Sequence, residues 1–423
     1  MASPIEKIAE DKKAESLASR YLRIRNTTVA LCQHLEPEDF VVQTMPDVSP
    51  AKWHLAHTTW FFERFVLEVY NPKYKRLNDR YHFLFNSYYH TAGEMHARPQ
   101  RGLLSRPTVK EIIHYREFVD EAMTKFVESS SMSPQAVDVL QLGLNHEQQH
   151  QELMLTDIKH VFSRNPFAPM VNPELAPSPR TQPTEHRFLS GQSGIHEVGA
   201  IGDGFCFDNE QPRHQALLHE HAMGSRLITN GEYLDFIRDG AYQKCDLWLS
   251  DGWSVVNKEA WSRPLYWDEA CEREFTLGGM RSLDLNAAVT HVSLYEADAF
   301  ARWAGARLPT EFEWELSASN EQVDGNLLES MHWHPVVAQN DNAQYYGDVW
   351  EWTTSAYSAY PGFQPLAGSL GEYNGKFMCN QMTVRGGSCV TAKEHIRASY
   401  RSFFYPQSKW QFLGFRLAKD GGP

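Results

Sequence analysis

One stretch of this chain, HEQQHQE at residues 146–152, restricts the fold more than any other. It lies in segment 133–162, which begins with serine and proline and has the apolar spacing of an amphipathic helix. Because four residues make about one helical turn, His146 and His150 project from the same face and can bind one metal ion. Gly143, one turn earlier, has no side chain to block a group approaching that face. The stretch predicts a long helix that carries two ligands of a candidate metal site.

Two other interpretations compete with this one. Histidines at this spacing also arise by chance in a chain with 19 of them, so the pair alone does not decide. The string also matches H-E-x-x-H, the zinc-protease helix in which Glu147 would be the base. The acidic third ligand of such a protease would have to be Glu174, which lies among Pro169, Pro173 and Pro177, where no helix forms. A protease is therefore disfavoured, and the location of a third ligand decides the question.

The length and composition describe a two-domain globular protein. A chain of 423 residues exceeds one ordinary core, and 42% hydrophobic with 22% charged residues is typical of a soluble protein. The net charge of −13, without a basic block, argues against nucleic acid or an anionic membrane as a partner. No run of about 18 apolar residues occurs, and because the start at residues 1–13 is charged we do not expect it to be a signal peptide. Six scattered cysteines fit a reducing compartment, so we expect a cytoplasmic protein.

The first half has four segments with helical spacing. Besides 133–162 they are residues 14–35, a helix that starts at Ser49, and one that follows Thr108, where a capping box is expected. They predict an antiparallel four-helix bundle. The second helix carries His54 and His57, which lie on different faces because three residues turn the helix by about 300°. Either one can be the third metal ligand or a hydrogen-bonded core residue.

The rest of the chain is irregular. Segment 86–102 is dense in Tyr, His and Arg and is broken by glycine and proline, as functional loops are. Prolines then mark a linker, and beyond it short strands and turns are interrupted by helices near 229–238 and 293–304. We expect an α plus α+β protein with three parts, which are a bundle at residues 10–165, a linker at 166–187 and an α+β domain at 188–421.

Several strings in the second half resemble the formylglycine-generating-enzyme (sulfatase-modifying factor) domain, a C-type-lectin-like fold. They are TNGEY at 229–233, RLPTEFEWE at 307–315, GDVWEW at 347–352, RGGS at 385–388 and GFRL at 414–417. The first half resembles a DinB-like bundle with a three-histidine iron site. Together and in this order, the two halves are similar to the nonheme-iron sulfoxide synthases of ergothioneine biosynthesis.

The resemblance implies an Fe(II) enzyme that uses O₂. In that family the iron ligands match His57, His146 and His150, so the resemblance selects His57 over His54. Glu152 lies about 200° round the helix from His150 and is expected to be structural or to support a ligand. Three neutral imidazoles leave three of about six iron positions open for a thiolate, an imidazole and O₂.

The resemblance also implies the reaction. The imidazole C2 of trimethylhistidine (hercynine) is joined to the sulfur of cysteine or γ-glutamylcysteine, and the product is the sulfoxide of this adduct. Gln149 matches a family residue that touches the hercynine imidazole. A quaternary ammonium group prefers aromatic faces, which four residues near the C-terminus could offer: Tyr400, Phe403, Phe404 and Trp410.

A phenol suits the role of proton donor to an iron–oxygen intermediate. Tyr88 and Tyr89 match a Tyr-Tyr pair in the branch of the family that takes free cysteine, and the sequence does not choose between them. Arg98 and Arg101 match family arginines that hold the carboxylate of the thiol substrate, because guanidinium pairs with carboxylate in a bidentate manner.

Two related activities remain as alternatives. Formylglycine-generating enzymes bind copper through two cysteines after the RGGS string, whereas this chain has Cys389 alone there, which we expect to be a packed core thiol. An ovothiol-type synthase would join cysteine to histidine, but that family usually carries a C-terminal methyltransferase domain that we do not find before residue 423. A pure binding module would not need the histidine-bearing bundle. A homo-oligomer is compatible with the sequence.

Overall fold

The computed structural model describes residues 15–129, 132–175, 181–339 and 344–422. Residues 10–14 of the expected bundle, and Pro177 and Pro179 of the expected linker, lie outside this part. The described chain forms two compact units. The bundle unit contains the described residues up to Val171 together with Leu366–Tyr373, and the second unit contains the remainder.

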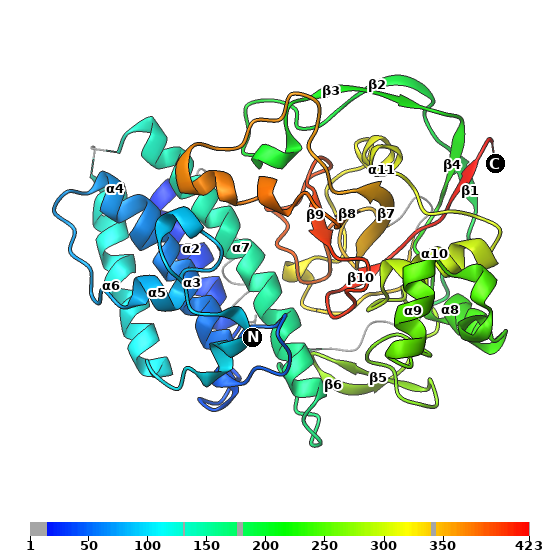
Figure 1. Ribbon diagram of the computed structural model, residues 1–423, viewed down its shortest axis with the longest axis horizontal. Coiled ribbons are helices and arrows are strands. Elements are labelled where there is room, and N and C mark those ends of the chain that lie inside the picture. The colour runs from blue at the N-terminus through cyan, green and yellow to red at the C-terminus, as the bar shows by residue number, and fades with distance from the viewer. Residues whose placement is uncertain (1–14, 130–131, 176–180, 340–343, 423) are drawn as a thin grey trace. The chain divides into compact units, whose positions relative to one another are not determined.

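Four long helices build the bundle unit, as expected (Figure 1). They are α2 (Leu17–Ala30), α3 (Ala51–Phe62), α6 (Val109–Glu128) and α7 (Pro134–Ser163). The side chain of Ser133 caps α7, and Thr108 and Glu111 form the expected capping box of α6. Each cap satisfies backbone N–H groups that have no partner inside the helix, which is why these helices begin where the sequence indicates.

Helix α3 occupies the centre of this unit. Every residue of α3 is buried, and the helix continues through a π-helical turn, η2 (Glu63–Leu67), into α4 (Glu68–Tyr70). Gly143 of α7 lies against it, and a Cβ at that position would come within 2.6 Å of Phe62 and 2.9 Å of Phe61. The space left by Gly143 is thus filled by two phenylalanine rings, and our expectation that it keeps an approach open was wrong.

Short elements complete the bundle unit. They are α5 (Tyr81–Phe85), η1 (Asp39–Val41), η3 (His90–Ala92), η4 (Arg98–Leu103) and η9 (Gly368–Glu372). The last of these comes from the segment Leu366–Tyr373, which the sequence places between strands of the second unit.

The second unit is α+β with small sheets. One sheet has the order β1-β4-β11 and another the order β10-β7-β8-β9, in which β10 and β7 are parallel. The pairs β2-β3 and β5-β6 each form a separate two-stranded antiparallel sheet. The strands are β1 (Phe188–Ser190), β2 (Gly194–Val198), β3 (His214–Leu218), β4 (His221–Gly224), β5 (Arg273–Thr276), β6 (Gly279–Ser282), β7 (Trp350–Ala356), β8 (Met382–Arg385), β9 (Ser402–Phe404), β10 (Leu413–Gly414) and β11 (Ala418–Asp420).

The two expected helices of this unit are present, and two more accompany them. The four are α8 (Asn230–Arg238), α9 (Ser250–Lys258), α10 (Leu294–Trp303) and α11 (Glu311–Ala318). A sequence signal for α11 exists, since Thr310 and Glu313 form a capping box. Short 3-10 turns are η5 (Asp208–Glu210), η6 (Ala241–Gln243), η7 (Cys245–Leu247), η8 (Leu328–Ser330) and η10 (Gly375–Phe377).

Four of the recognised strings hold the core of this unit through two buried ion pairs. Arg416 of the GFRL string donates to both carboxylate oxygens of Glu351 in the GDVWEW string, at 2.6 and 2.9 Å. Arg385 of the RGGS string pairs with Glu315 and donates to backbone carbonyls. Cys389 is buried and forms no disulfide with the other cysteines, all of which are described. These strings therefore maintain the fold.

Candidate metal centre

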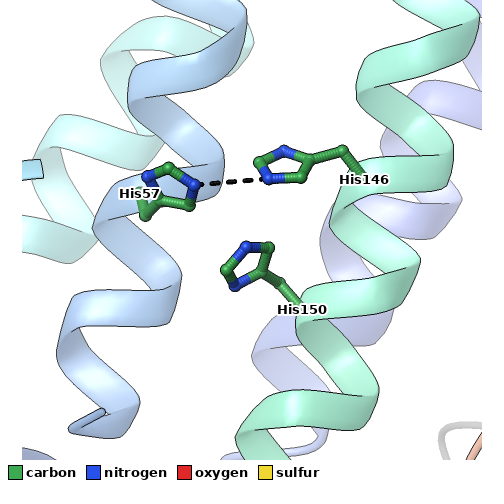
Figure 2. A group of neighbouring side chains, drawn as sticks. All are labelled: His57, His146 and His150. Carbon is green, nitrogen blue, oxygen red and sulfur yellow. Dashed lines mark hydrogen bonds between the residues drawn. The ribbon is translucent and has the colours of Figure 1, made fainter. Parts of the chain in front are cut away.

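Three buried imidazoles converge in the bundle unit (Figure 2). His57 comes from α3, and His146 and His150 come from successive turns of α7. One ring nitrogen of each lies within 4.8 Å of the others, and the Nε2 atoms of His57 and His146 are 3.3 Å apart. The i, i+4 spacing thus brings the rings of His146 and His150 to the same face of α7, as predicted, and the third ring comes from α3, which packs against α7.

The remaining ring nitrogens show which nitrogen faces the centre. Nδ1 of His57 lies 2.6 Å from the carbonyl oxygen of Phe85, to which it can donate. Nδ1 of His150 lies 2.9 Å from Nδ1 of His54. Nδ1 of His146 is buried and has no hydrogen-bond partner among the described residues. Nε2 of His57 and of His150 is therefore left to face the space between the helices.

Burial keeps these imidazoles neutral. It lowers the pKa of His146 to about 3 and lowers the pKa of His57 and His150 well below the ordinary value, with the neighbouring histidines adding to the effect for the last two. A neutral imidazole has a free lone pair, which is the form that binds a metal. Uncharged and close together, the rings are ready to act as ligands.

The residues present fit a divalent transition metal. Two nitrogens that each lie about 2 Å from one ion at a right angle are about 3 Å apart, close to the 3.3 Å between His57 and His146. Imidazole ligands suit iron, copper, nickel and zinc. His54 is not in the three-residue group and lies behind His150.

Glu147, the glutamate of the H-E-x-x-H string, lies in a buried ion cluster. Arg116 and Arg25 both donate to its carboxylate, the latter at 2.9 Å, and Thr28 donates at 2.6 Å. Although burial alone would raise the pKa of Glu147, the two arginines lower it to about 2. A carboxylate bound in this way cannot serve as the base of a zinc protease, which agrees with the sequence argument. Glu152 is also buried and lies outside the histidine group.

The ring of Trp53 connects Arg101 to the histidine group. Its guanidinium carbon is 3.3 Å from the centroid of Trp53, and Trp53 stacks on His57 at 4.6 Å. Arg101 is 3% exposed and donates to Ser49 and Ser87, but it forms no ion pair within the described residues. Burial lowers its pKa, as expected for a cation removed from water without an anion. Arg98, by contrast, is exposed and donates to the backbone carbonyl of Asp47.

The two candidate tyrosines stack on each other, with 4.6 Å between ring centroids. Tyr89 is fully buried against Phe65 and Trp60, and Trp60 in turn stacks on His57. Burial, followed by the phenol of Tyr88, raises the pKa of Tyr89. Tyr89 thus lies beside an aromatic side chain that borders the histidine group, and Tyr88 stacks on Tyr89.

The structure adds Tyr373, which the sequence analysis missed. Its ring lies 5.5 Å from that of His146 and 6.4 Å from that of Tyr88, and its hydroxyl donates to Oε1 of Gln149. Gln149, the expected hercynine contact, is half-buried on α7. Tyr373 is 224 positions from Gln149 in the chain, so no local pattern relates the two.

Glu372 attaches this segment to the bundle. Its carboxylate accepts hydrogen bonds from the backbone N–H groups of His90 and Thr91, at 3.1 and 2.9 Å, and from the Thr91 hydroxyl at 2.6 Å. Ser369 makes a further hydrogen bond to Thr91. The anchored residues directly follow the tyrosine pair, so Glu372 holds both Tyr373 and the loop of Tyr88.

The four aromatic residues expected to bind the ammonium group belong to the second unit. Phe404 and Trp410 are in edge contact at 6.3 Å. Phe403 is the neighbouring residue of strand β9, so it points from the opposite face, and it stacks on Tyr357 at 4.0 Å. Tyr400 is buried beside Trp350 and Phe207. The structure therefore divides the four residues among different surroundings.

Comparison with known families assigns the chain. A model of the sulfatase-modifying factor enzyme 1-like domain matches residues 173–421, and a model of the DinB superfamily matches residues 20–154. The first match covers more than half of the chain, which belongs to the sulfatase-modifying factor enzyme 1-like family. The bundle and the C-type-lectin-like fold expected from the sequence are thereby confirmed.

Individual relatives extend this likeness to the full length. The hercynine oxygenase of Mycobacterium tuberculosis is 28% identical over 434 residues, which cover 96% of this chain and 99% of the relative. That of Mycolicibacterium thermoresistibile is 27% identical over 450 residues, covering 98% and 96%. The formylglycine-generating enzyme of Streptomyces coelicolor is 26% identical over 312 residues, covering 60% and 94%.

The full-length likeness confirms the resemblance seen in the sequence, and the protein is an oxygen-using oxidoreductase. In the part of the chain that the structure describes, no helix is both long enough and apolar enough to span a membrane.

Proposed function

We propose that the protein is an Fe(II)-dependent sulfoxide synthase of ergothioneine biosynthesis. It joins the imidazole C2 of hercynine to L-cysteine with O₂ and gives a hercynyl-cysteine sulfoxide. The observation that carries this proposal is the group of three neutral, buried imidazoles at His57, His146 and His150, in a chain similar over its length to hercynine oxygenases.

The three histidines would hold the iron, with His57 and His150 binding through Nε2. When bound, iron supplies the redox chemistry for O₂ and lowers the pKa of a coordinated thiol. Imidazole is neutral, so the ligands do not offset the positive charge that attracts a substrate thiolate. The described residues place no carboxylate in the group.

Arg101 is proposed to bind the carboxylate of the thiol substrate. Its burial without an anionic partner among the described residues leaves a desolvated cation near the metal centre, which a carboxylate would neutralise. Trp53 fixes the plane of the guanidinium and also contacts His57, so a carboxylate on Arg101 would lie near the metal. Cysteine and γ-glutamylcysteine both have a carboxylate at the same distance from the thiol, so Arg101 can bind either; we favour cysteine because Tyr88 and Tyr89 resemble the tyrosine pair of the cysteine-using branch. Arg98 is assigned a weaker, solvent-exposed contribution.

Tyr88 and Tyr89 are proposed as the proton donors. Burial raises the pKa of Tyr89, so its phenol keeps its proton at neutral pH. Tyr88 is less buried and stacks on Tyr89, so it is better placed to meet substrate. A phenol held in this state can donate a proton or a hydrogen atom without needing a charged acid.

Gln149 is proposed to contact the imidazole of hercynine. The amide of Gln149 offers a hydrogen bond to an imidazole, and the hydroxyl of Tyr373 fixes its orientation. The trimethylammonium group would be held by aromatic faces. Among Tyr400, Phe403, Phe404 and Trp410, the contacting pair Phe404 and Trp410 offers two rings to one cation.

The test is O₂ uptake with mass analysis of the product, after anaerobic loading with Fe(II). Hercynine with cysteine, hercynine with γ-glutamylcysteine and histidine with cysteine are supplied separately. We expect a sulfoxide adduct from the first pair. An adduct from the second would correct the thiol donor, one from the third would assign an ovothiol-type activity, and none from any pair would refute the proposal. His57→Ala should abolish both iron retention and turnover, whereas His114→Ala, an exposed histidine of α6, should change neither.

A further inference from the structure

A second histidine and a carboxylate stand behind His150. Nδ1 of His54 lies 2.9 Å from Nδ1 of His150, and Nε2 of His54 lies 3.1 Å from Oδ2 of Asp157. The same Oδ2 accepts the backbone N–H of Ser49 at 2.7 Å. All four residues are buried, with His54 at 2% and Asp157 at 3% exposure. Neither His54 nor Asp157 has a part in the proposed chemistry.

The contacts impose a direction on this chain of hydrogen bonds. Oδ2 of Asp157 accepts from Ser49, so it is an acceptor and Nε2 of His54 must carry the proton between them. In a neutral imidazole the other nitrogen is then an acceptor. Nδ1 of His54 therefore accepts from Nδ1 of His150, and Nε2 of His150 has no proton. That is the tautomer of His150 that can bind a metal through Nε2.

We infer that His54 and Asp157 are positioning residues that fix the tautomer and the ring orientation of His150 as a metal ligand. Metal-binding histidines generally donate their second N–H to an oriented acceptor, and loss of that acceptor costs about 10–100-fold in metal affinity. This inference rests on the proposed iron site and adds to it the hydrogen-bond acceptor behind His150. It also gives a role to His54, the histidine of α3 that does not belong to the three-histidine group.

A purely structural role predicts a different outcome. Asp157 ties α7 to the start of α3 through Ser49, so its loss can lower stability without any metal effect. The ring of His54, by contrast, bonds to two side chains, those of His150 and Asp157, and to no backbone group in the described part of the chain. The affinity of the folded protein for metal, measured apart from its stability, therefore separates the two roles.

The experiment is chelator competition for Fe(II) under anaerobic conditions, with the full chain and its variants. His54→Leu removes the acceptor, and His54→Gln keeps one acceptor and one donor. We expect His54→Leu to weaken Fe(II) binding by about 10–100-fold and His54→Gln to recover part of it. The matched control is His160→Leu, since His160 is equally buried on α7 but its Nδ1 bonds to Thr44. The control should bind Fe(II) as the wild type does.

Thermal unfolding of each metal-free variant shows whether it is folded before affinity is compared. In the double variant His54→Leu with Asp157→Asn, affinity should fall no further than in His54→Leu alone, because the two residues act through one hydrogen-bond chain. Wild-type affinity in a folded His54→Leu variant overturns the inference. If His54→Leu is not folded, the inference is overturned when the two single variants Asp157→Asn and His54→Gln both bind Fe(II) with the affinity of the wild type. Failure of the wild type to bind Fe(II) instead refutes the proposed function, so the two failures are distinguishable.

Discussion

The guanidinium of Arg101 lies 3.3 Å from the centre of the Trp53 ring, and that indole also stacks on His57. A buried cation is thus connected to a candidate metal ligand through one aromatic ring. Arg101 also bonds to Ser49, whose N–H binds Asp157. The proposed substrate-binding arginine and the hydrogen-bond chain behind His150 therefore meet at Ser49, so the loop before α3 holds both.

Replacing Arg101 should weaken binding of the thiol substrate selectively. Loss of a hydrogen bond to a charged group costs about 1.5–3 kcal/mol, so kcat/KM for cysteine should fall about 10–150-fold in Arg101→Gln. Cysteamine, which has no carboxylate, is the matched substrate and should lose little. Equal losses with cysteine and cysteamine would show that Arg101 does not bind the carboxylate. Arg98→Gln, an exposed neighbour, should have the smaller effect.

Removing either phenol of the stacked pair should change the product. Tyr88→Phe and Tyr89→Phe keep the rings and their packing but cannot donate a proton, so the yield of sulfoxide per O₂ should fall, with thiol oxidation increasing in its place. The measurement is the ratio of the two products by mass spectrometry. Full sulfoxide yield in both single variants and in the double variant would remove the tyrosines from the mechanism.

Tyr373→Phe tests the residue that only the structure reveals. A neutral hydrogen bond contributes about 0.5–1.5 kcal/mol, so the KM for hercynine should rise about 2–12-fold as Gln149 loses the hydrogen bond from Tyr373. The KM for cysteine should change less. Tyr405→Phe is a control, because Tyr405 is 50% exposed. An unchanged hercynine KM would show that Tyr373 does not orient Gln149 for binding.

Glu147→Gln should destabilise the metal-free protein, because among the described residues it leaves Arg116 buried without an anionic partner and leaves Arg25 paired with Asp120 alone. Breaking a buried ion pair in this way costs about 3–5 kcal/mol, measurable as a lower free energy of unfolding in urea at pH 7. Glu121→Gln, an exposed residue of α6, should cost much less.

The difference in stability between the wild type and Glu147→Gln should depend on pH. The folded pKa of Glu147 is lowered to about 2, below the unfolded value of about 4.3. Its contribution is therefore complete above the unfolded pKa and is lost as pH falls toward the folded pKa. The difference between wild type and Glu147→Gln should be largest above pH ~5 and should shrink between pH ~4.3 and ~2. A difference that grows on acidification would contradict the assignment of Glu147 as an ionised partner.

The sequence alone determined the features that depend on neighbours in the chain. Helix starts at Thr108 and Ser133 were readable because a cap bonds within the first helical turn. His146 and His150 share a face because helical geometry places residues i and i+4 together. The capping box of Thr310 and Glu313 is an equally local signal for the start of α11.

Only the tertiary structure decided which distant side chains meet. Helix α3 is buried on all sides, so its sequence has no solvent-facing stripe that would orient His54 relative to His57. The contact of Tyr373 with Gln149 joins segments that no periodicity relates, and the burial of Arg101 depends on packing against Trp53. Local spacing fixes which face of a helix a residue occupies, but packing between elements decides what that face meets.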